Sequence, residues 1–395
     1  MISLARYAAL LEPRELRQLF AASMIGRLPI GITGLAILIL VQSATDSFAQ
    51  GGAATGCYVA GLAAVAPVLG KLIDRYGPRP VLLACGMLFP TALCALVLGV
   101  SRDVPAWLLF LLAAAAGTSF PPITVCMRTL LRRRLGEDAL LSAAYSLESV
   151  LIELIFIVGP MLVALFVAVA SPAVAVFAAA GCGFAGTLLF LRLPALRTWH
   201  IEPAAGRSLF GALAEPGFAP LIGVILCYSI AFGLMEIGLT AYATEAGSPA
   251  LAGVLLGLMS AGSAVGGLAY GSRSWHYPLA RQFAVMLALM GAGLALLVLP
   301  WAPWPFAAWS VLAGVVMAPA LIIQSMLVVK TSRPEHLSEA FTWSASALLS
   351  GVGIGLAAGG GLLEFHRSAA ALAAAASAAF VGAIMARLAL RGAAR

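Results

Sequence analysis

Long apolar segments, separated by short polar or Pro/Gly-rich breaks, run along almost the whole chain. A helix needs about 20 apolar residues to cross the hydrocarbon core of a bilayer, and the segments have about that length. They lack the alternating polarity of membrane barrel strands. The pattern predicts an all-α integral membrane protein with twelve transmembrane helices, near residues 16–42, 50–70, 80–100, 105–130, 140–168, 172–193, 217–243, 249–271, 280–300, 304–329, 337–362 and 367–390.

Composition supports a lipid environment for most of the chain. Hydrophobic residues make up 62% of the 395 positions and charged residues only 10%. A water-soluble domain of this size needs a more highly charged surface. Backbone groups inside a bilayer must be hydrogen-bonded within the protein, so helices are the expected form of these segments. The lipid bilayer is therefore the first predicted partner.

The distribution of basic residues predicts the orientation of the helices. Lys and Arg near the ends of spans are retained on the cytoplasmic side. With the N-terminus inside, 20 of the 23 basic residues lie on that side, and the exceptions are Arg27, Arg102 and Arg367. We expect a multi-pass protein of the bacterial cytoplasmic (inner) membrane with both termini cytoplasmic. This topology explains the net charge of +7, and no basic stretch is interleaved with aromatic residues, so nucleic acid is not expected as a partner.

The chain also contains an internal repeat. An offset of 197 residues places Gly117 on Gly314 and Pro122 on Pro319, and it superposes the fourth and fifth spans on the tenth and eleventh. The repeat predicts two pseudo-symmetric halves. Their expected bounds are 1–193 for an N-terminal six-helix bundle, 194–216 for a cytoplasmic linker and 217–395 for a C-terminal six-helix bundle.

A charged turn bounded by glycines lies between the second and third spans. It reads Gly70-Lys71-Leu72-Ile73-Asp74-Arg75-Tyr76-Gly77-Pro78-Arg79. Gly70 permits close approach of another helix, and Gly77 supplies the permissive backbone that a chain reversal needs. The Asp74 carboxylate can accept hydrogen bonds from backbone N–H groups or pair with a cation. A basic loop that only sets topology is the alternative interpretation.

This turn is similar to the G-x-L-x-D-R-x-G-x-[RK] signature of the major facilitator superfamily of secondary transporters. The matching residues are Gly70, Asp74, Arg75, Gly77 and Arg79. The resemblance implies two six-helix bundles with a substrate site near the membrane midplane between them. It also implies a gating role for the loop, which in the family is thought to latch the two halves together in the outward-facing state.

A second, partial resemblance concerns the fifth span. Gly159-Pro160 resembles the start of the G-P-x-x-G-G signature of drug:proton antiporters, but Val163 and Ala164 occupy the two later glycine positions. The pattern is closest to the 12-span drug/metabolite:proton antiporter group. Small-residue packing between helices is expected here in any case.

Four ionisable residues lie inside predicted spans, namely Arg27, Glu148, Glu153 and Glu236. Such residues are costly in lipid and usually face a cavity or a partner. In the superfamily the first and seventh spans line the central cavity, so Arg27 and Glu236 are expected to face each other, with a structural ion pair or a snorkelling Arg27 as alternatives. Glu148 and Glu153 lie on different faces of one helix. A carboxylate that is shielded from water binds a proton more readily than one in water. The three glutamates and Arg27 are therefore the candidates for proton coupling or substrate binding.

Other polar residues complete the candidate site. Tyr228, Gln324 and Trp343 can line the cavity, although packing explains each of them equally well. No catalytic residues, metal site or cofactor are expected, because the four histidines are scattered at loops and span ends. The chain lacks the G-x-x-x-x-G-K-[ST] motif of nucleotide-driven pumps, so an ion gradient is the expected energy source.

These observations predict a secondary active transporter that moves a small organic molecule by alternating access, with protons as the coupling ion and export as the direction. The alternatives are proton-coupled uptake of a metabolite and the flipping of an amphiphile or lipid. A membrane-embedded enzyme and a non-transporting sensor are remoter alternatives. A monomer is expected, because the fold needs no partner to form its pathway.

Overall fold

The protein was analysed as a computed structural model, which describes residues 11–135, 139–196, 213, 215, 217–271, 275–299, 301–333 and 337–390. Its first eight described helices, together the N-terminal half, are α2 (Arg14–Arg27), α3 (Pro29–Thr45), α4 (Phe48–Tyr76), α5 (Pro78–Ser101), α6 (Ala106–Thr118), α7 (Ile123–Leu135), α8 (Ala139–Val169) and α9 (Pro172–Leu191). The short 3-10 helix η1 (Pro194–Leu196) follows.

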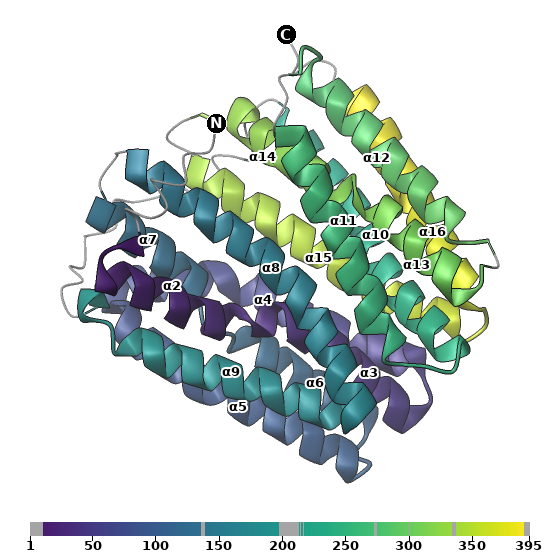
Figure 1. The fold of residues 1–395 in the computed structure, drawn as a ribbon, viewed down its shortest axis with the longest axis horizontal. Coiled ribbons are helices and arrows are strands. Elements are labelled where there is room, and N and C mark those ends of the chain that lie inside the picture. Colours follow the sequence, from purple (N-terminus) through teal and green to yellow (C-terminus); the bar gives the residue numbers. More distant parts are fainter. Residues whose placement is uncertain are drawn as a thin grey trace.

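The second group of helices forms the C-terminal half. It consists of α10 (Phe218–Glu245), α11 (Leu251–Gly271), α12 (Leu279–Leu296), α13 (Pro303–Gly314), α14 (Met317–Thr331), α15 (Leu337–Leu363) and α16 (Ser368–Ala389). The helices of the two halves lie on opposite sides of the molecule (Figure 1). We call the end at which α2 begins and α16 ends the terminal end, and the other the opposite end. Most of the predicted linker, 197–212 together with 214 and 216, lies outside the described residues.

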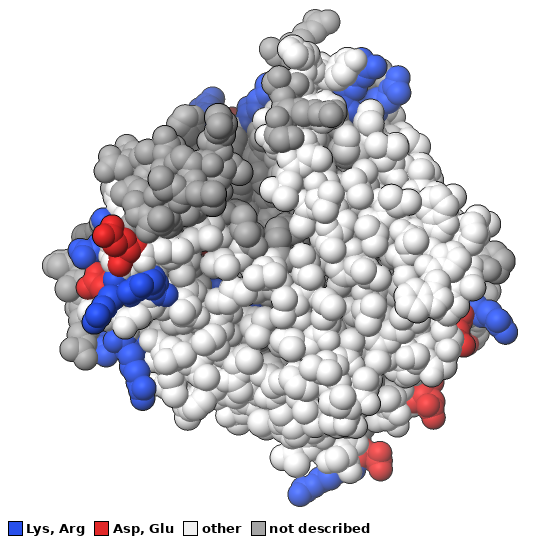
Figure 2. Space-filling model, viewed as in Figure 1, with Lys and Arg blue, Asp and Glu red and all other residues white. Residues whose placement is uncertain are grey.

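The all-helical membrane architecture is confirmed. Within the described residues, ten helical segments are long and apolar enough to cross a membrane. Helices α4 and α8 occupy two further predicted spans, 50–70 and 140–168, and the total of twelve spans stays a prediction. On the face in Figure 2, charged side chains gather towards the ends and edges, with a wide uncharged surface between them. Large apolar residues such as Leu88, Leu111 and Leu312 are exposed at the surface of the molecule, as expected where lipid is the solvent.

Three predicted spans, 16–42, 105–130 and 304–329, are each built from two consecutive helices. The first divides at Leu28, because Pro29 has no N–H with which to continue the hydrogen-bond ladder. The next divides at Pro121-Pro122 for the same reason. The last divides at Val315-Val316, between the end of α13 at Gly314 and the start of α14 at Met317. The apolar pattern continues through each break, so the sequence alone predicts one helix.

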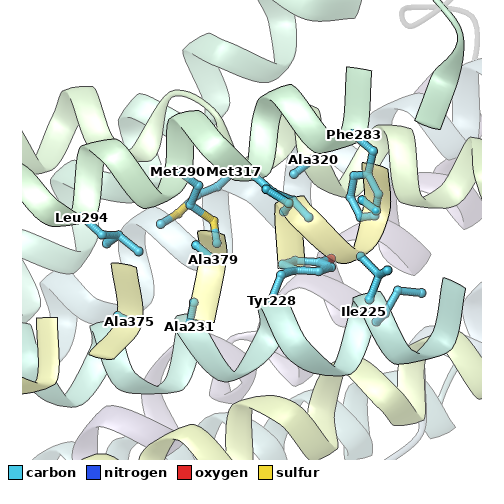
Figure 3. Packing of buried hydrophobic residues seen from close by; sticks show 14 of the residues in the cluster. Ile225, Tyr228, Ala231, Phe283, Met290, Leu294, Met317, Ala320, Ala375 and Ala379 are labelled. Atoms are coloured by element: carbon cyan, nitrogen blue, oxygen red, sulfur yellow. The ribbon is translucent and has the colours of Figure 1, made fainter. Parts of the chain in front are cut away.

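Buried apolar residues form separate cores in the two halves. One cluster consists only of residues from the C-terminal half, among them Tyr228, Phe283 and Met290 (Figure 3). Another, around Phe20, Leu82 and Phe190, consists only of residues from the N-terminal half. A third cluster lies mainly in α3, α5, α6 and α9, and it takes in four residues from the C-terminal half, Ile237, Ala243, Ala252 and Leu356. The halves therefore pack internally as bodies and share apolar contacts with each other.

Contacts between the halves are close at the opposite end. Gly52 in α4 lies against the Leu356 carbonyl of α15, and Gly253 in α11 lies against the Pro160 carbonyl of α8, with no room for a Cβ at either glycine. Small residues of this kind let membrane helices approach closely. At the same end, Glu364 accepts hydrogen bonds from the Ser47 hydroxyl and, at 3.4 Å, from the Ala49 N–H. The carboxylate at the end of α15 thus caps the first turn of α4.

Candidate functional site

The N-terminal half contains a charged cluster inside the span region. Arg27, the last residue of α2, has 2% of its side chain exposed, and Glu148 of α8 has 1%. The Arg27 Nη1 lies 3.3 Å from the Glu148 Oε1. Arg27 Nη1 also donates to the Ser23 hydroxyl at 3.3 Å and lies 3.6 Å from the Met127 sulfur. Arg27 thus has its ion-pair partner within its own half.

A second arginine completes the cluster. The Arg128 Nε, from α7, lies 3.1 Å from the Glu148 Oε1 and 3.0 Å from its Oε2. The Arg128 side chain is 54% exposed, so it joins the buried carboxylate to the surface of the molecule. One carboxylate is therefore held by two guanidinium groups, and the three side chains together carry one excess positive charge.

The buried arginine is incompletely paired. Within the part of the chain that the structure describes, the Arg27 Nε and Nη2 are buried and have no hydrogen-bond partner. Buried donors without partners are rare in native proteins, because each costs about 1–3 kcal/mol in lost hydration. Unpaired donors beside an excess positive charge favour an additional acceptor that is anionic.

Glu236 lies in the middle of α10 and faces the N-terminal half. Its Oε1 would lie 3.7 Å from a Cβ placed on Gly34 of α3, and the Thr55 methyl of α4 would lie 3.8 Å from the same point. The Thr55 hydroxyl is engaged elsewhere, since it donates to the Gly51 carbonyl at 3.0 Å. Among the described residues, none donates a hydrogen bond or offers a cation to the partly buried Glu236 carboxylate. The expected pairing of Arg27 with Glu236 is wrong in this structure, because Glu148 pairs with Arg27 instead.

The C-terminal half holds a neutral polar network. The Tyr228 hydroxyl of α10 donates to the Gln324 Oε1 of α14, and the Gln324 Nε2 donates to the Ser344 hydroxyl of α15 at 2.7 Å. Tyr228 has no exposed surface, and its ring packs edge-on against Phe283; Figure 3 shows it among apolar side chains.

The expectation that Tyr228 and Gln324 line a cavity therefore needs correction. Both are buried, and hydrogen bonds to neighbouring helices hold them within the packed bundle. Trp343 is partly buried and packs against the same core. These residues tie three helices together, which satisfies their polar atoms away from lipid.

The signature loop has the expected backbone. Gly77 has a φ of 80° between α4 and α5, a value that favours glycine, and Pro78 begins α5. Arg75 and Arg79 are exposed. A Cβ on Gly70 would meet no atom within 4 Å, so the close helix approach expected there is absent. The side chains of Lys71, Asp74 and Glu153 lie outside the described part of the structure, and their roles stay predictions.

The Gly159-Pro160 pair lies at a crossing of three helices. Gly159 packs directly against Gly31 of α3, while the Pro160 carbonyl contacts Gly253 of α11 in the other half. Small-residue packing at this position is confirmed, although Val163 and Ala164 replace the glycines of the antiporter signature. Ala164 itself also contacts Gly253.

Two of these residues were not identified from the sequence as functional candidates. They are Arg128 of the charged cluster and Ser344 of the neutral network. By its position near the end of the predicted span 105–130, Arg128 is most simply interpreted as a basic anchor on the cytoplasmic side. A signal was nevertheless present, because Arg128 and Glu148 lie at comparable distances on either side of the loop between α7 and α8. Two residues on consecutive antiparallel helices can contact each other when they lie at the same depth in the membrane. An Arg and a Glu placed in this way predict an ion pair.

Comparison with known proteins decides the family. A sequence model of the Major Facilitator Superfamily matches residues 19–274, which is more than half of the chain. The chain belongs to the Major Facilitator Superfamily. It is accordingly a transporter and not an enzyme. No curated protein matches the sequence.

Several solved transporters share the fold of this superfamily member. Nucleoside transporter NupG is 14% identical, with a TM-score of 0.71 over 96% of this chain and 100% of that one. A variant of peptide transporter POT in complex with alafosfalin is 14% identical, with a TM-score of 0.74 over 97% and 95%. A bacterial homologue of iron transporter ferroportin in an inward-facing state is 15% identical, with a TM-score of 0.72 over 97% and 99%. At these identities the likeness concerns the fold alone.

Proposed function

We propose that this superfamily member is a proton-coupled carrier that exports a small organic molecule by alternating access. Glu236 is the observation that carries the proposal. Its carboxylate lies at mid-helix against Gly34 of the other half, and no described residue pairs with it. An intramembrane carboxyl group without a partner can gain and lose a proton as its exposure to water changes. A group between two moving halves undergoes such a change.

The division into two bundles supports this mechanism. We take residues 1–193 and 217–395 as the bodies that rock against each other, joined by the 194–216 linker. Contacts through Gly52 and Gly253 at the opposite end are suited to opening and closing, because they consist of van der Waals packing. The loop residues Gly70, Asp74, Arg75, Gly77 and Arg79 then act at the terminal end as the gate that the family resemblance implies.

The proposal includes a location and an assembly state. We place the protein in a bacterial inner membrane as a monomer, with both termini in the cytoplasm. The support is the distribution of basic residues, since 20 of 23 fall on one side of the predicted topology. Export accords with the antiporter-like Gly159-Pro160 pair.

Proton flux in proteoliposomes tests the function. Vesicles with an internal pH dye receive an imposed proton gradient and a panel of nucleosides, dipeptides, organic cations and organic anions. Substrate-dependent proton movement is expected in the wild type and is expected to be lost in Glu236→Gln. The direction of substrate movement relative to the protons separates export from uptake.

Glu245→Gln is the matched control. Glu245 ends the same helix, but its carboxylate accepts hydrogen bonds from the Ser368 N–H at 2.7 Å and the Ser368 hydroxyl at 2.8 Å within one half. This variant should retain the flux. Equal coupling in the wild type and in Glu236→Gln would contradict the role of Glu236, and transport without proton movement would contradict proton coupling.

A further inference from the structure

We propose that Arg27 and Arg128 form a binding site for a carboxylate group, which Glu148 occupies in this structure and which the carboxylate of an organic-anion substrate takes over during transport. The inference rests on the proposed carrier function and adds the substrate class. Arg27 and Arg128 then bind the substrate during transport, in addition to holding Glu148 in this structure.

The first support is the number of unused donors. Arg27 leaves its buried Nε and Nη2 without partners among the described residues, and Arg128 reaches Glu148 through its Nε alone. The terminal nitrogens of Arg128 make no hydrogen bond to the residues that the structure describes. A guanidinium group presents its N–H donors in a planar fork that matches a carboxylate with two parallel hydrogen bonds. The pair therefore has the donors for a carboxylate beyond those that Glu148 uses.

The second support is the charge of the cluster. Two guanidinium groups and one carboxylate leave one positive charge, and Arg27 is 2% exposed. Glu148 can balance the charge of only one of the two guanidinium groups, so the arginine pair attracts a further anion. A bound organic anion neutralises the cluster, so the protein itself favours an anionic ligand over a neutral or cationic one at this position.

The third support is access. The Arg128 side chain is 54% exposed while its Nε contacts the buried Glu148 carboxylate, so one residue reaches both the surface and the cluster. Arg27 lies seven residues before Gly34, the contact of Glu236. Arg27 and Gly34 lie on the consecutive helices α2 and α3, which divide at Leu28, and at 1.5 Å per residue their backbones are about 10 Å apart. The carboxylate site and the proposed proton carrier are thus close enough to serve one small substrate.

Chemical rescue of purified Glu148→Ala with formate tests whether the arginine pair accepts an external carboxylate. Removal of the side chain leaves both arginines without an acid and leaves space that formate can fill. We expect a lowered unfolding midpoint that rises with the logarithm of formate concentration, as for a ligand that binds the native state. Formamide, which has the same shape without the charge, and chloride at equal ionic strength should have no such effect.

Two further variants separate this effect from general stabilisation by salt. Glu245→Ala removes a carboxylate that accepts hydrogen bonds from Ser368 and forms no ion pair with an arginine of the described part of the chain, so formate should give no specific shift. Adding Arg128→Gln to Glu148→Ala should abolish the rescue. If Glu148→Ala is not recovered as folded protein even in formate, the measurement is made on Glu148→Ser, which also removes the acid and leaves room for formate. An absent formate-specific shift in the variant measured overturns the site.

Inhibition of wild-type flux tests whether the substrate uses the site. Benzoate should inhibit substrate-dependent proton flux, and benzamide should not. Equal inhibition by both compounds, or by neither, overturns the assignment of the substrate class. The outcomes also separate the two proposals. If formate rescues the variant but the protein shows no proton-coupled flux, the carboxylate site is supported and the carrier mechanism is overturned. If flux depends on Glu236 but formate gives no rescue, the carrier mechanism is supported and the carboxylate site is overturned.

Discussion

The two halves hold polar clusters at corresponding places, but the clusters differ in chemistry. In the N-terminal half, Arg27, Arg128 and Glu148 connect α2, α7 and α8 through charges. In the C-terminal half, Tyr228, Gln324 and Ser344 connect the corresponding helices α10, α14 and α15 through neutral hydrogen bonds.

The repeat supports this correspondence, although Tyr228 itself falls on Gly31 of α3, four residues after Arg27. At the offset of 197 residues, Gln324 falls on Met127, the residue before Arg128, and Ser344 falls on Leu147, the residue before Glu148. Neutral hydrogen bonds are sufficient to link three helices at this depth, so structural linkage alone does not explain the charges. The comparison supports the proposal that the N-terminal cluster has a role in transport.

Loss of the shared carboxylate should have the largest effect. Glu148→Gln leaves two arginines without an acid, and breaking a buried ion pair on one side typically costs about 3–5 kcal/mol. We expect this loss in the free energy of unfolding, measured by denaturant titration in detergent, together with loss of proton-coupled flux. Stability within about 1 kcal/mol of the wild type would show that the cluster is hydrated and not buried.

Gln324→Leu should have an intermediate effect on stability. It leaves the Tyr228 and Ser344 hydroxyl groups without their partner, at a cost of about 1–3 kcal/mol. Flux per folded molecule should stay at the wild-type level, as measured in proteoliposomes with matched amounts of inserted protein. If flux is lost while stability changes little, the neutral network is functional and the contrast between the halves disappears.

A smaller effect is expected for Tyr228→Phe. The substitution removes one hydroxyl and keeps the ring packed against Phe283, so about 0.5–1.5 kcal/mol of stability should be lost. Flux should again be unchanged. A loss well above that of Gln324→Leu in the same titration would show that Tyr228, and not Gln324, organises the network.

The smallest stability effect should come from replacing the whole charged cluster. In the triple variant Arg27→Met, Arg128→Met and Glu148→Leu, no charge is left unpaired, and apolar replacements of buried ion pairs are often neutral or stabilising. The unfolding free energy should stay close to that of the wild type, while proton-coupled flux should be absent. A triple variant that transports normally would remove the functional interpretation of the charges.

Sequence reasoning was most successful where local chemistry decides the structure. The apolar runs predicted the membrane helices, and the φ of 80° at Gly77 confirmed the predicted reversal before Pro78. The breaks inside three spans were missed, because the apolar pattern continues across Pro29 and Pro121-Pro122. For Arg27, Glu148 and Glu236, the sequence showed that charges lie within the spans but assigned Arg27 to the wrong partner.

The sequence by itself determined the membrane environment, the helical fold class and the family, because chain length, hydrophobicity and a local turn signature carry that information. The tertiary structure alone decided that Glu148 joins Arg27 to Arg128, that Glu236 lies against Gly34, and that Tyr228 and Gln324 are packed within one half. These pairings depend on the rotation of each helix about its axis and on its neighbours. Packing between segments that are distant in the sequence sets the rotation of each helix and its neighbours. A helix that is hydrophobic on all sides has no sequence pattern that specifies which face points inward.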